Sequence, residues 1–222
     1  MWTKDAVQQQ KGHPHCQCLL IPRVSKVKQT GSTNYAEFIK NSPPKLQDQL
    51  LPVWAKEAVQ DGVALDDLIK PDGVGLLSKQ EAMPLLNNAV VEKLVAKLAE
   101  KAKNSGALQA LLANPPSLKG HIDKRILQGH VKDETDYLSQ VKAALTSAER
   151  FNLATSKFPS VELIGGNWSV ILNHDGLIKT AYLHEKHMKS FADIQTQKGH
   201  DIYGRDIGAG LREQLNKLFD LR

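Results

Sequence analysis

The first group of side chains suited to proton transfer and anion binding lies in residues 119–132. This segment also has the densest local excess of positive charge in the chain. Four cations there face a single acid, Asp123, and they are Lys119, Lys124, Arg125 and Lys132. His121 and His130 lie among them. Imidazole exchanges protons near neutral pH, and ammonium and guanidinium groups donate to phosphate oxygens. This composition favours a site that binds an anion and moves a proton.

A second group of polar side chains lies in residues 168–184. Two runs rich in β-formers flank an Asp-Gly dipeptide at positions 175–176, a combination typical of a two-residue hairpin turn. That turn predicts a hairpin with Val170 opposite Ala181 and Leu172 opposite Lys179. A four-residue loop is the alternative and would change the register.

Alternation along the two strands sorts the hairpin into two faces. One face is apolar and predicts a core, with Trp168, Val170, Leu172, Leu177, Ala181 and Leu183. The other carries a row of polar groups, with Ser169, Ile171, Asn173, Ile178, Thr180 and Tyr182. We therefore expect a sheet that packs on helices with one face and holds a wet site on the other.

Charge and composition set the class of protein. The 222 residues are 41% apolar and 24% charged with a formal charge of +5, which permits an anionic partner. No apolar run reaches 18 residues, so we expect no membrane span. Cys16 and Cys18 are too close together to indicate a disulfide framework.

A His-Pro-His-Cys-Gln-Cys run at positions 13–18 suggests zinc at first sight. A tetrahedral site usually draws its ligands as two pairs from separated segments, and no second pair follows nearby. Alternation places the two thiols on one face of a short strand, where they pack well. His184-Glu185-Lys186-His187 offers only two histidines. We expect no metal and no cofactor.

Helical spacing organises the rest of the chain. Pro43-Pro44 starts a small helical segment, and Pro52 interrupts it. A helix over 88–103 carries the stripe Val91, Leu94, Val95 and Leu98. A helix over 119–129 comes next, then one capped by Asp133 that buries Tyr137, Leu138, Val141 and Leu145. A strand over 161–164 precedes the hairpin, and two helices before an antiparallel sheet predict an α+β fold.

Two family resemblances follow. The motif at 13–18, the helix start Tyr35-Ala36-Glu37-Phe38-Ile39-Lys40, and the segments 43–51 and 61–69 resemble the C-terminal end of the minor head protein of Mu-type tailed phages, the MuF family. Gly129-His130, 168–173 and 176–182 resemble the phage branch of the barnase–EndoU–colicin–RelE (BECR) superfamily of metal-independent RNases. They imply a MuF-type segment over 1–70, a helical linker over 71–104 and a BECR-like nuclease domain over 105–222.

The BECR resemblance implies RNA cleavage by the substrate's own 2′-hydroxyl, which needs proton transfer and cations around the phosphorane. We expect His130 as the acid or base, Thr180 as a phosphate donor, and Lys124, Arg125 and Lys179 as charge stabilisers. His121, Ser169, Tyr182 and His184 complete the set as substrate-binding residues.

The resemblances also imply partners and a location. The implied partners are RNA, such as tRNA or another host RNA, phage portal or capsid proteins, and an immunity protein. The implied location is the virion or the bacterial cytoplasm. The alternative is a non-enzymatic virion structural or head morphogenesis protein with a degenerate nuclease fold. Each predicted site residue also has a purely structural explanation, because cations commonly lie on solvated helix faces and hydroxyls pair across sheets.

Overall fold

A computed structural model describes residues 35–73, 75–105, 108–113, 115–185 and 189–219. The chain divides into two units, Met1–Thr33 and Asn34–Arg222, and every described residue belongs to the second. The predicted strand and thiol motif at positions 13–18 lie outside the described residues.

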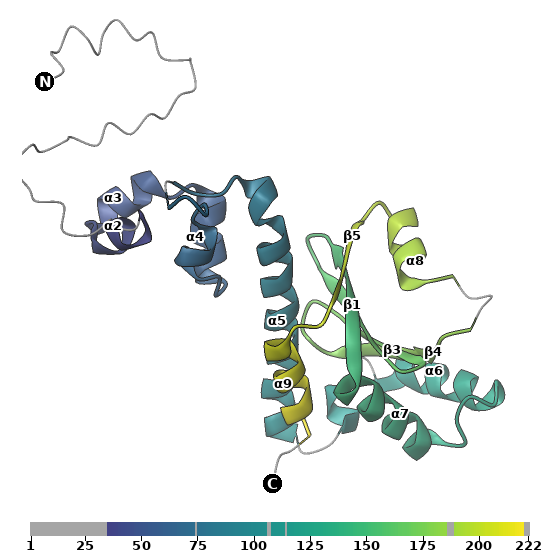
Figure 1. Ribbon diagram of the computed structural model, residues 1–222. Helices are drawn as coiled ribbons and strands as arrows, with labels where there is room; N and C mark the ends of the chain where they lie inside the picture. Colours follow the sequence, from purple (N-terminus) through teal and green to yellow (C-terminus); the bar gives the residue numbers. More distant parts are fainter. Residues whose placement is uncertain (1–34, 74, 106–107, 114, 186–188, 220–222) are drawn as a thin grey trace, which may run out of the picture. The chain divides into compact units, whose positions relative to one another are not determined.

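Short helices come first in the second unit. They are α2 (Tyr35–Asn41), α3 (Pro44–Leu50), α4 (Val53–Gln60) and a 3₁₀ turn, η1 (Leu65–Leu68) (Figure 1). Proline sets two of the boundaries, because Pro44 opens α3 and Pro52 caps α4. Both effects of proline were predicted. These helices bury only small apolar clusters, one around Ala55 and Leu68 and another around Ile39.

Helix α5 (Lys79–Ser105) joins two apolar cores. Its beginning packs Ala82 with Ala55 and Ala58 of the first helices. Its later turns bury the predicted stripe of Val91, Leu94, Val95 and Leu98 in the main core. The helix expected as a linker is therefore also an integral part of the sheet-bearing core.

The main core lies under an antiparallel sheet with the strand order β4-β3-β2-β1-β5. The strands are β1 (Ala148–Thr155), β2 (Ser160–Gly165), β3 (Trp168–Leu172), β4 (Ile178–Leu183) and β5 (Asp201–Asp206). One face packs on α5, α7 (Glu134–Thr146) and α9 (Ala209–Lys217). The α+β prediction is confirmed.

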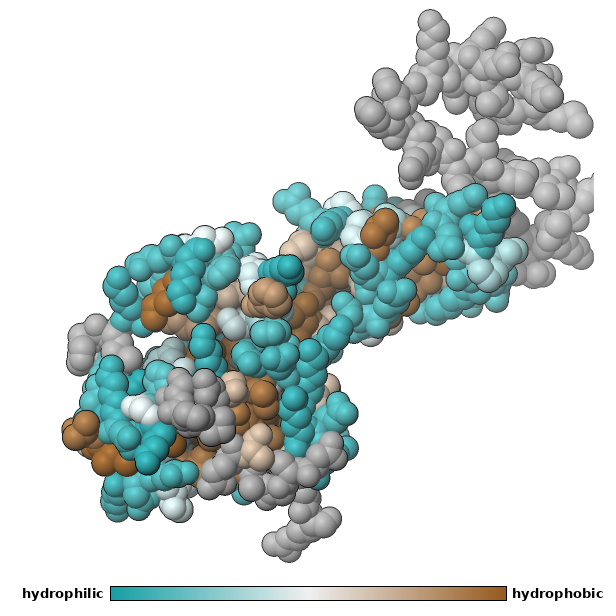
Figure 2. Space-filling model, turned by 180° about the vertical axis from the view of Figure 1, so that it is seen from behind, coloured by the Kyte–Doolittle hydropathy of each residue, from teal (hydrophilic) through white to brown (hydrophobic). Residues whose placement is uncertain are grey.

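The other face is partly covered by a short helix, α8 (Phe191–Gln197). Phe191 is buried against Ala154 of β1 and Ile171 of β3. Sequence analysis expected an open face here and predicted neither β1 nor β5. On the side of the molecule seen in Figure 2, hydrophilic residues predominate and hydrophobic residues reach the surface in several separate patches.

Two further helices precede the sheet in the sequence. A 3₁₀ turn, η2 (Leu108–Leu111), leads to α6 (Pro115–Leu127), which contacts β4. Asp133 caps α7 through the predicted contact, because its side chain accepts the Asp136 N–H. Tyr137, Val141 and Leu145 are fully buried as expected, whereas Leu138 is half-buried.

The β3–β4 hairpin corrects one part of the prediction. Val170 does pair with Ala181, but Leu172 pairs with Ile178 and not with Lys179. The loop has three residues, since Asn173 N–H bonds to Leu177 O, and Lys179 is an extra residue in a β-bulge. The bulge turns Ile178 into the main core, whereas the expected alternation had placed it on the polar face.

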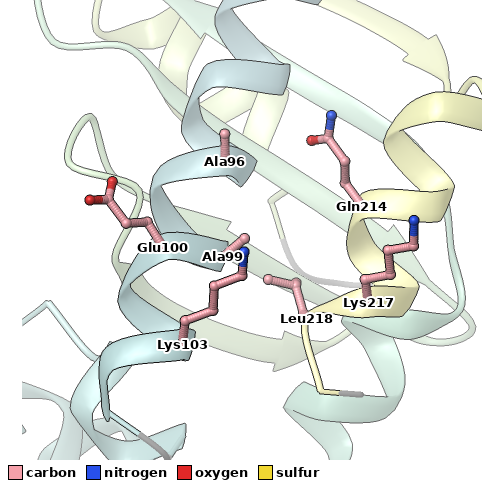
Figure 3. Close-up of a pocket in the computed structure, with 7 residues that line it drawn as sticks. All are labelled: Ala96, Ala99, Glu100, Lys103, Gln214, Lys217 and Leu218. Carbon is pink, nitrogen blue, oxygen red and sulfur yellow. The ribbon is translucent and has the colours of Figure 1, made fainter. Parts of the chain in front are cut away.

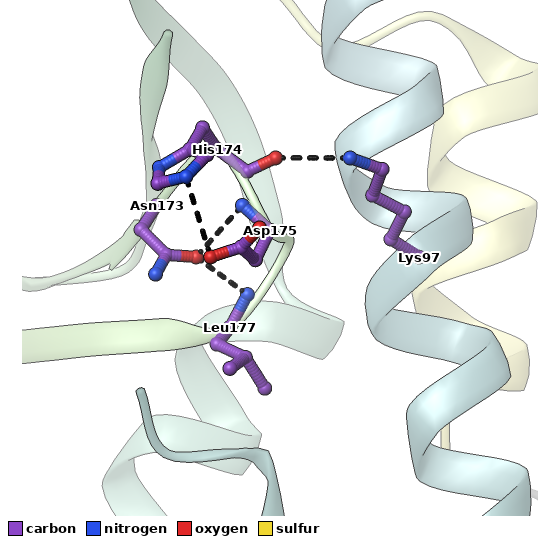
Figure 4. A network of polar contacts seen from close by, with 5 residues as sticks. All are labelled: Lys97, Asn173, His174, Asp175 and Leu177. Atoms are coloured by element: carbon purple, nitrogen blue, oxygen red, sulfur yellow. Dashed lines mark hydrogen bonds and ion pairs between the residues drawn. The ribbon is translucent and has the colours of Figure 1, made fainter. Parts of the chain in front are cut away.

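The hairpin loop is fixed against α5 (Figure 4). Lys97 Nζ donates to the His174 carbonyl at 3.0 Å, and Asn173 Oδ1 accepts the N–H groups of Asp175 and Leu177. Gly176 has a φ of +74°, and a Cβ there would lie 2.6 Å from the Leu94 carbonyl oxygen. The close approach of the loop to the helix therefore requires glycine at this position.

We expect Gly176→Ala to reduce the free energy of unfolding by roughly 2–5 kcal/mol in urea denaturation. About 1–2 kcal/mol is the cost of a left-handed backbone at a residue with Cβ, and about 1–3 kcal/mol comes from overpacking against α5. The control is Gly129→Ala, because Gly129 has a φ of +72° but open space around its Cβ position. Equal losses in the two variants would contradict the role of the α5 contact.

Candidate functional site

The predicted site residues gather along β4, an edge strand whose outer backbone groups are covered. Ala113 N–H donates to the Ile178 carbonyl at 2.8 Å. The Tyr137 hydroxyl accepts the Ala181 N–H at 2.8 Å and donates to the Ala181 carbonyl at 3.4 Å. These contacts hold α7 and the segment between η2 and α6 beside β4, and they occupy an edge that would otherwise be free to pair.

The positive charges of three residues on α6 and β4, two elements in contact, act on one imidazole. His121 is an exposed residue, but partial desolvation and then the positive charges of Arg125, Lys124 and Lys179 lower its pKa from 6.5. We call these four residues the His121 cluster. Lys124 and Lys179 are exposed, whereas Arg125 is 6% exposed. The cluster joins residues that are more than 50 positions apart in the sequence, and all four were predicted site residues.

Arg125 is held at its buried position by Gln128, which follows the last residue of α6. One guanidinium nitrogen, Nη1, donates to Gln128 Oε1 at 2.7 Å, and the buried Nε has no hydrogen-bond partner among the described residues. The positive charge also acts on Tyr137, since it opposes the rise that burial causes in the pKa of that phenol. The Thr180 hydroxyl acts on the same phenol in the same direction.

His130 pairs with a residue beyond the C-terminal end of β4. Its Nε2 is 2.9 Å from Glu185 Oε1, and its side chain is 8% exposed. Glu185 follows Thr180 by five residues, which is on the order of 16 Å along an extended strand. The predicted acid or base therefore pairs with a residue beyond the C-terminal end of β4, whereas the predicted phosphate donor lies near the beginning of that strand.

A second polar network crosses the sheet face under α8. It brings together three predicted residues, because Ser169 Oγ lies 2.7 Å from His184 Nε2 and the Tyr182 and His184 rings meet edge to face at 5.5 Å. The Tyr182 hydroxyl donates to the Glu162 carboxylate, which also accepts from Asn152 Nδ2 at 2.7 Å. The network thus runs over four strands from Asn152 to His184.

Sequence analysis missed Glu162 and Asn152 as members of this network. Glu162 is only 2% exposed, and a buried carboxylate requires hydrogen-bond donors. Burial and then the Glu162 carboxylate raise the pKa of the Tyr182 hydroxyl, which therefore stays protonated and donates. An acid inside the apolar run of β2 was the one signal in the sequence that pointed to this residue.

A cavity of about 340 Å³ lies between α5 and α9, away from β4 (Figure 3). Its walls include the alkyl side chains of Ala96, Ala99 and Leu218, and Glu100, Lys103 and Lys217 also line it. It contains no imidazole, thiol or hydroxyl group. The chemistry that these residue types offer is weaker than that of the His121 cluster.

The His121 cluster has the parts that a phosphodiester needs. Cations from two elements provide donors for phosphate oxygens, and an imidazole with a lowered pKa is neutral and able to accept a proton at pH 7. Among the described residues, no three His, Cys, Asp or Glu side chains lie close enough together to hold a metal ion. In the same part of the chain, no helix is long and apolar enough to span a membrane.

Comparisons with known proteins give one family. The model of the family described as "Uncharacterised protein aq_aa01" matches residues 102–221, which include α6, the whole sheet and α9. No curated protein and no solved structure matches the chain. Because the match covers more than half of the sequence, the chain belongs to the aq_aa01 family.

Proposed function

We propose that residues 105–222 form a metal-independent endoribonuclease that cleaves RNA by attack of the 2′-hydroxyl on the adjacent phosphate. The observation that carries the proposal is the His121 cluster, in which His121, Lys124 and Arg125 lie three and four residues apart on α6, beside the strand with Lys179, and the three charges lower the pKa of the imidazole. The reaction class comes from the resemblance of the hairpin and Gly129-His130 to the BECR superfamily.

Electrostatics support an anionic ligand at this place. Like charges brought together repel one another and reduce the stability of the folded chain, so Lys124, Arg125 and Lys179 are better accounted for by an anion that they bind. Perturbed titration of a group beside such charges is typical of functional sites. A phosphodiester supplies the missing negative charge.

RNA is the substrate that needs the fewest catalytic groups, because it provides its own nucleophile. His121 accepts the proton of the 2′-hydroxyl, and the three cations stabilise the charge of the phosphorane. Lys124 and Lys179 are exposed ammonium groups and are the candidates to give a proton to the leaving 5′-oxygen. This assignment differs from the prediction from the sequence, which gave proton transfer to His130.

Other predicted residues have supporting roles in the proposal. Glu185 holds the His130 ring, a contact that joins the segment after α6 to the segment after β4. The exposed His184 ring, oriented by Ser169, is available to contact the RNA strand. The Thr180 hydroxyl is buried and has no hydrogen-bond partner among the described residues, so the phosphate contact predicted for it is not part of the proposal.

The MuF resemblance of residues 1–70 indicates the partners and the place of action of the proposed nuclease. On the MuF resemblance, residues 1–70 associate with phage portal or capsid proteins, and the nuclease acts in the bacterial cytoplasm after carriage in the virion. An immunity protein that covers the His121 cluster is the partner expected for a toxic RNase.

The test is incubation of the purified full chain with total RNA in the presence of EDTA. We expect cleavage with products that end in a 2′,3′-cyclic phosphate, which only attack by the 2′-hydroxyl produces. Activity that EDTA abolishes would contradict a metal-independent mechanism. Co-purification with portal or capsid protein without any RNA cleavage would favour the non-enzymatic alternative.

A further inference from the structure

A second cavity, of about 250 Å³, lies between the tips of two hairpins and the end of α8. The β1–β2 hairpin contributes Phe158, the β3–β4 hairpin contributes His174 and Lys179, and the segment after α8 contributes Lys198 and His200. The volume lies below the roughly 300–1,000 Å³ of pockets for drug-sized ligands. A single planar ring with one attached phosphate suits this space.

The cavity has an exposed aromatic surface. Phe158 is 60% exposed, although a phenylalanine ring is usually buried. Its ring centroid lies 4.9 Å from that of His174, and the two planes are inclined by 56°. The inclined contact covers only part of the Phe158 ring, which is why most of that side chain stays accessible. Exposed rings of this kind are the platforms on which single-stranded bases stack.

The charges around the cavity favour an anion beside the ring. Lys179 and Lys198 line it together with two histidines, and no aspartate or glutamate is among the lining residues. Lys157 Nζ lies over one face of the Phe158 ring, 5.5 Å from its centroid, and adds a third cation next to the cavity. Asp175 lies nearby and pairs with His174 at 3.4 Å. An aromatic platform with lysines on its border is a combination suited to nucleic acid.

One wall of the cavity is already held in place. His174 belongs to the hairpin loop that Lys97 and Gly176 fix against α5 (Figure 4). A binding surface that is ordered before the ligand arrives loses less conformational entropy on binding. The ring of His174 is thus pre-positioned beside Phe158.

Lys179 connects this cavity with the His121 cluster. The same residue lines the cavity and contributes to the lowered pKa of His121. A nucleotide whose base lies on Phe158 therefore has its phosphate close to the cations of the cluster. Neighbouring nucleotides of one strand would occupy the two places.

The geometry points to a base-binding subsite at Phe158 and His174 for one unpaired nucleotide of single-stranded RNA, an inference that rests on the proposed endoribonuclease function. Paired bases are stacked inside a duplex and do not reach the ring, so the subsite selects single strands. It also explains why an apolar ring is kept exposed at a hairpin tip among lysines.

The test uses a fluorescein-labelled five-nucleotide RNA with 2′-O-methyl groups, which binds but has no 2′-hydroxyl to attack. Its affinity for the full chain is measured by fluorescence anisotropy. We expect Phe158→Ala to weaken binding roughly 5- to 150-fold, the range for loss of one stacked base. Phe158→Trp should bind at least as tightly as the unmodified chain, because it keeps an aromatic face.

The control is Val53→Ala, which removes an exposed apolar side chain on α4 outside the cavity and should leave affinity unchanged. An affinity of Phe158→Ala equal to that of the control would overturn the subsite, and so would equal binding of a duplex of the same sequence. The analogue separates the two proposals. If binding depends on Phe158 but ordinary RNA is not cleaved, the nuclease proposal is contradicted and the single-strand binding site stands. If RNA is cleaved and Phe158→Ala does not alter the cleavage, only the subsite is contradicted.

Discussion

Replacing His121 by alanine should lower the rate of RNA cleavage by about 10²- to 10⁴-fold, the usual contribution of a general acid or base. The imidazole is the one group of the cluster that is neutral at pH 7 and able to accept a proton. The measurement is the initial rate of cleavage by the full chain under saturating RNA. Lys101→Met, which removes an exposed cation on α5, is the control and should keep full activity.

The pH dependence of kcat/KM makes this prediction specific for proton transfer. The neutral imidazole is the active form, so the rate rises with pH through the pKa of His121. Burial and three cations lower that pKa from 6.5, and the midpoint of the acidic limb is therefore expected below pH 6.5. Lys124→Met removes one of the cations, raises the pKa and moves the limb to higher pH, whereas Lys101→Met should not move it. An acidic limb at the same pH in all three proteins would show that another group carries the proton.

Local signals were sufficient for the elements that the sequence predicted. The stripe on α5, the Asp133 cap of α7 and the existence of the β3–β4 hairpin depend on residues a few positions apart. β1 follows α7 almost without a break and exposes Glu149 and Arg150, so no alternating pattern separates it from the helix. β5 has no buried residue, and it is a strand because it pairs with β1. Such pairing is not visible in a window of sequence.

The site was predictable in residue type but not in arrangement. Lys124, Arg125 and His121 share one helix, and their charge was evident from composition. The pairing of His130 with Glu185 spans 55 positions, and it occupies the imidazole that the sequence favoured for proton transfer. The bulge at Lys179 shifted Ile178 into the core and set Lys179 beside the helix cations. Long-range contacts and a single extra residue decided both outcomes.

The largest loss of stability is expected at Tyr137. Its ring is fully buried and meets Trp168 edge to face at 6.1 Å, so Tyr137→Ala leaves a cavity that should cost about 3–5 kcal/mol. Its hydroxyl is in addition the partner of both backbone groups of Ala181 on the outer side of β4. Leaving the buried N–H without an acceptor adds roughly 1–3 kcal/mol. Urea denaturation of the full chain measures the sum.

Tyr137→Phe separates the hydroxyl from the ring. It keeps the packing and removes only the contact with β4, so we expect a loss of roughly 1–3 kcal/mol in the free energy of unfolding. Tyr203→Phe is the matched control, because the Tyr203 hydroxyl makes one long contact of 3.4 Å with Asn88 at a half-buried position. If the two phenylalanine variants lose the same stability, the hydroxyl of Tyr137 does not support the sheet edge. A larger loss for Tyr137→Phe means that the edge strand carrying Lys179 is held in place by a side chain of α7, and the position of this proposed phosphate donor then depends on that one phenol.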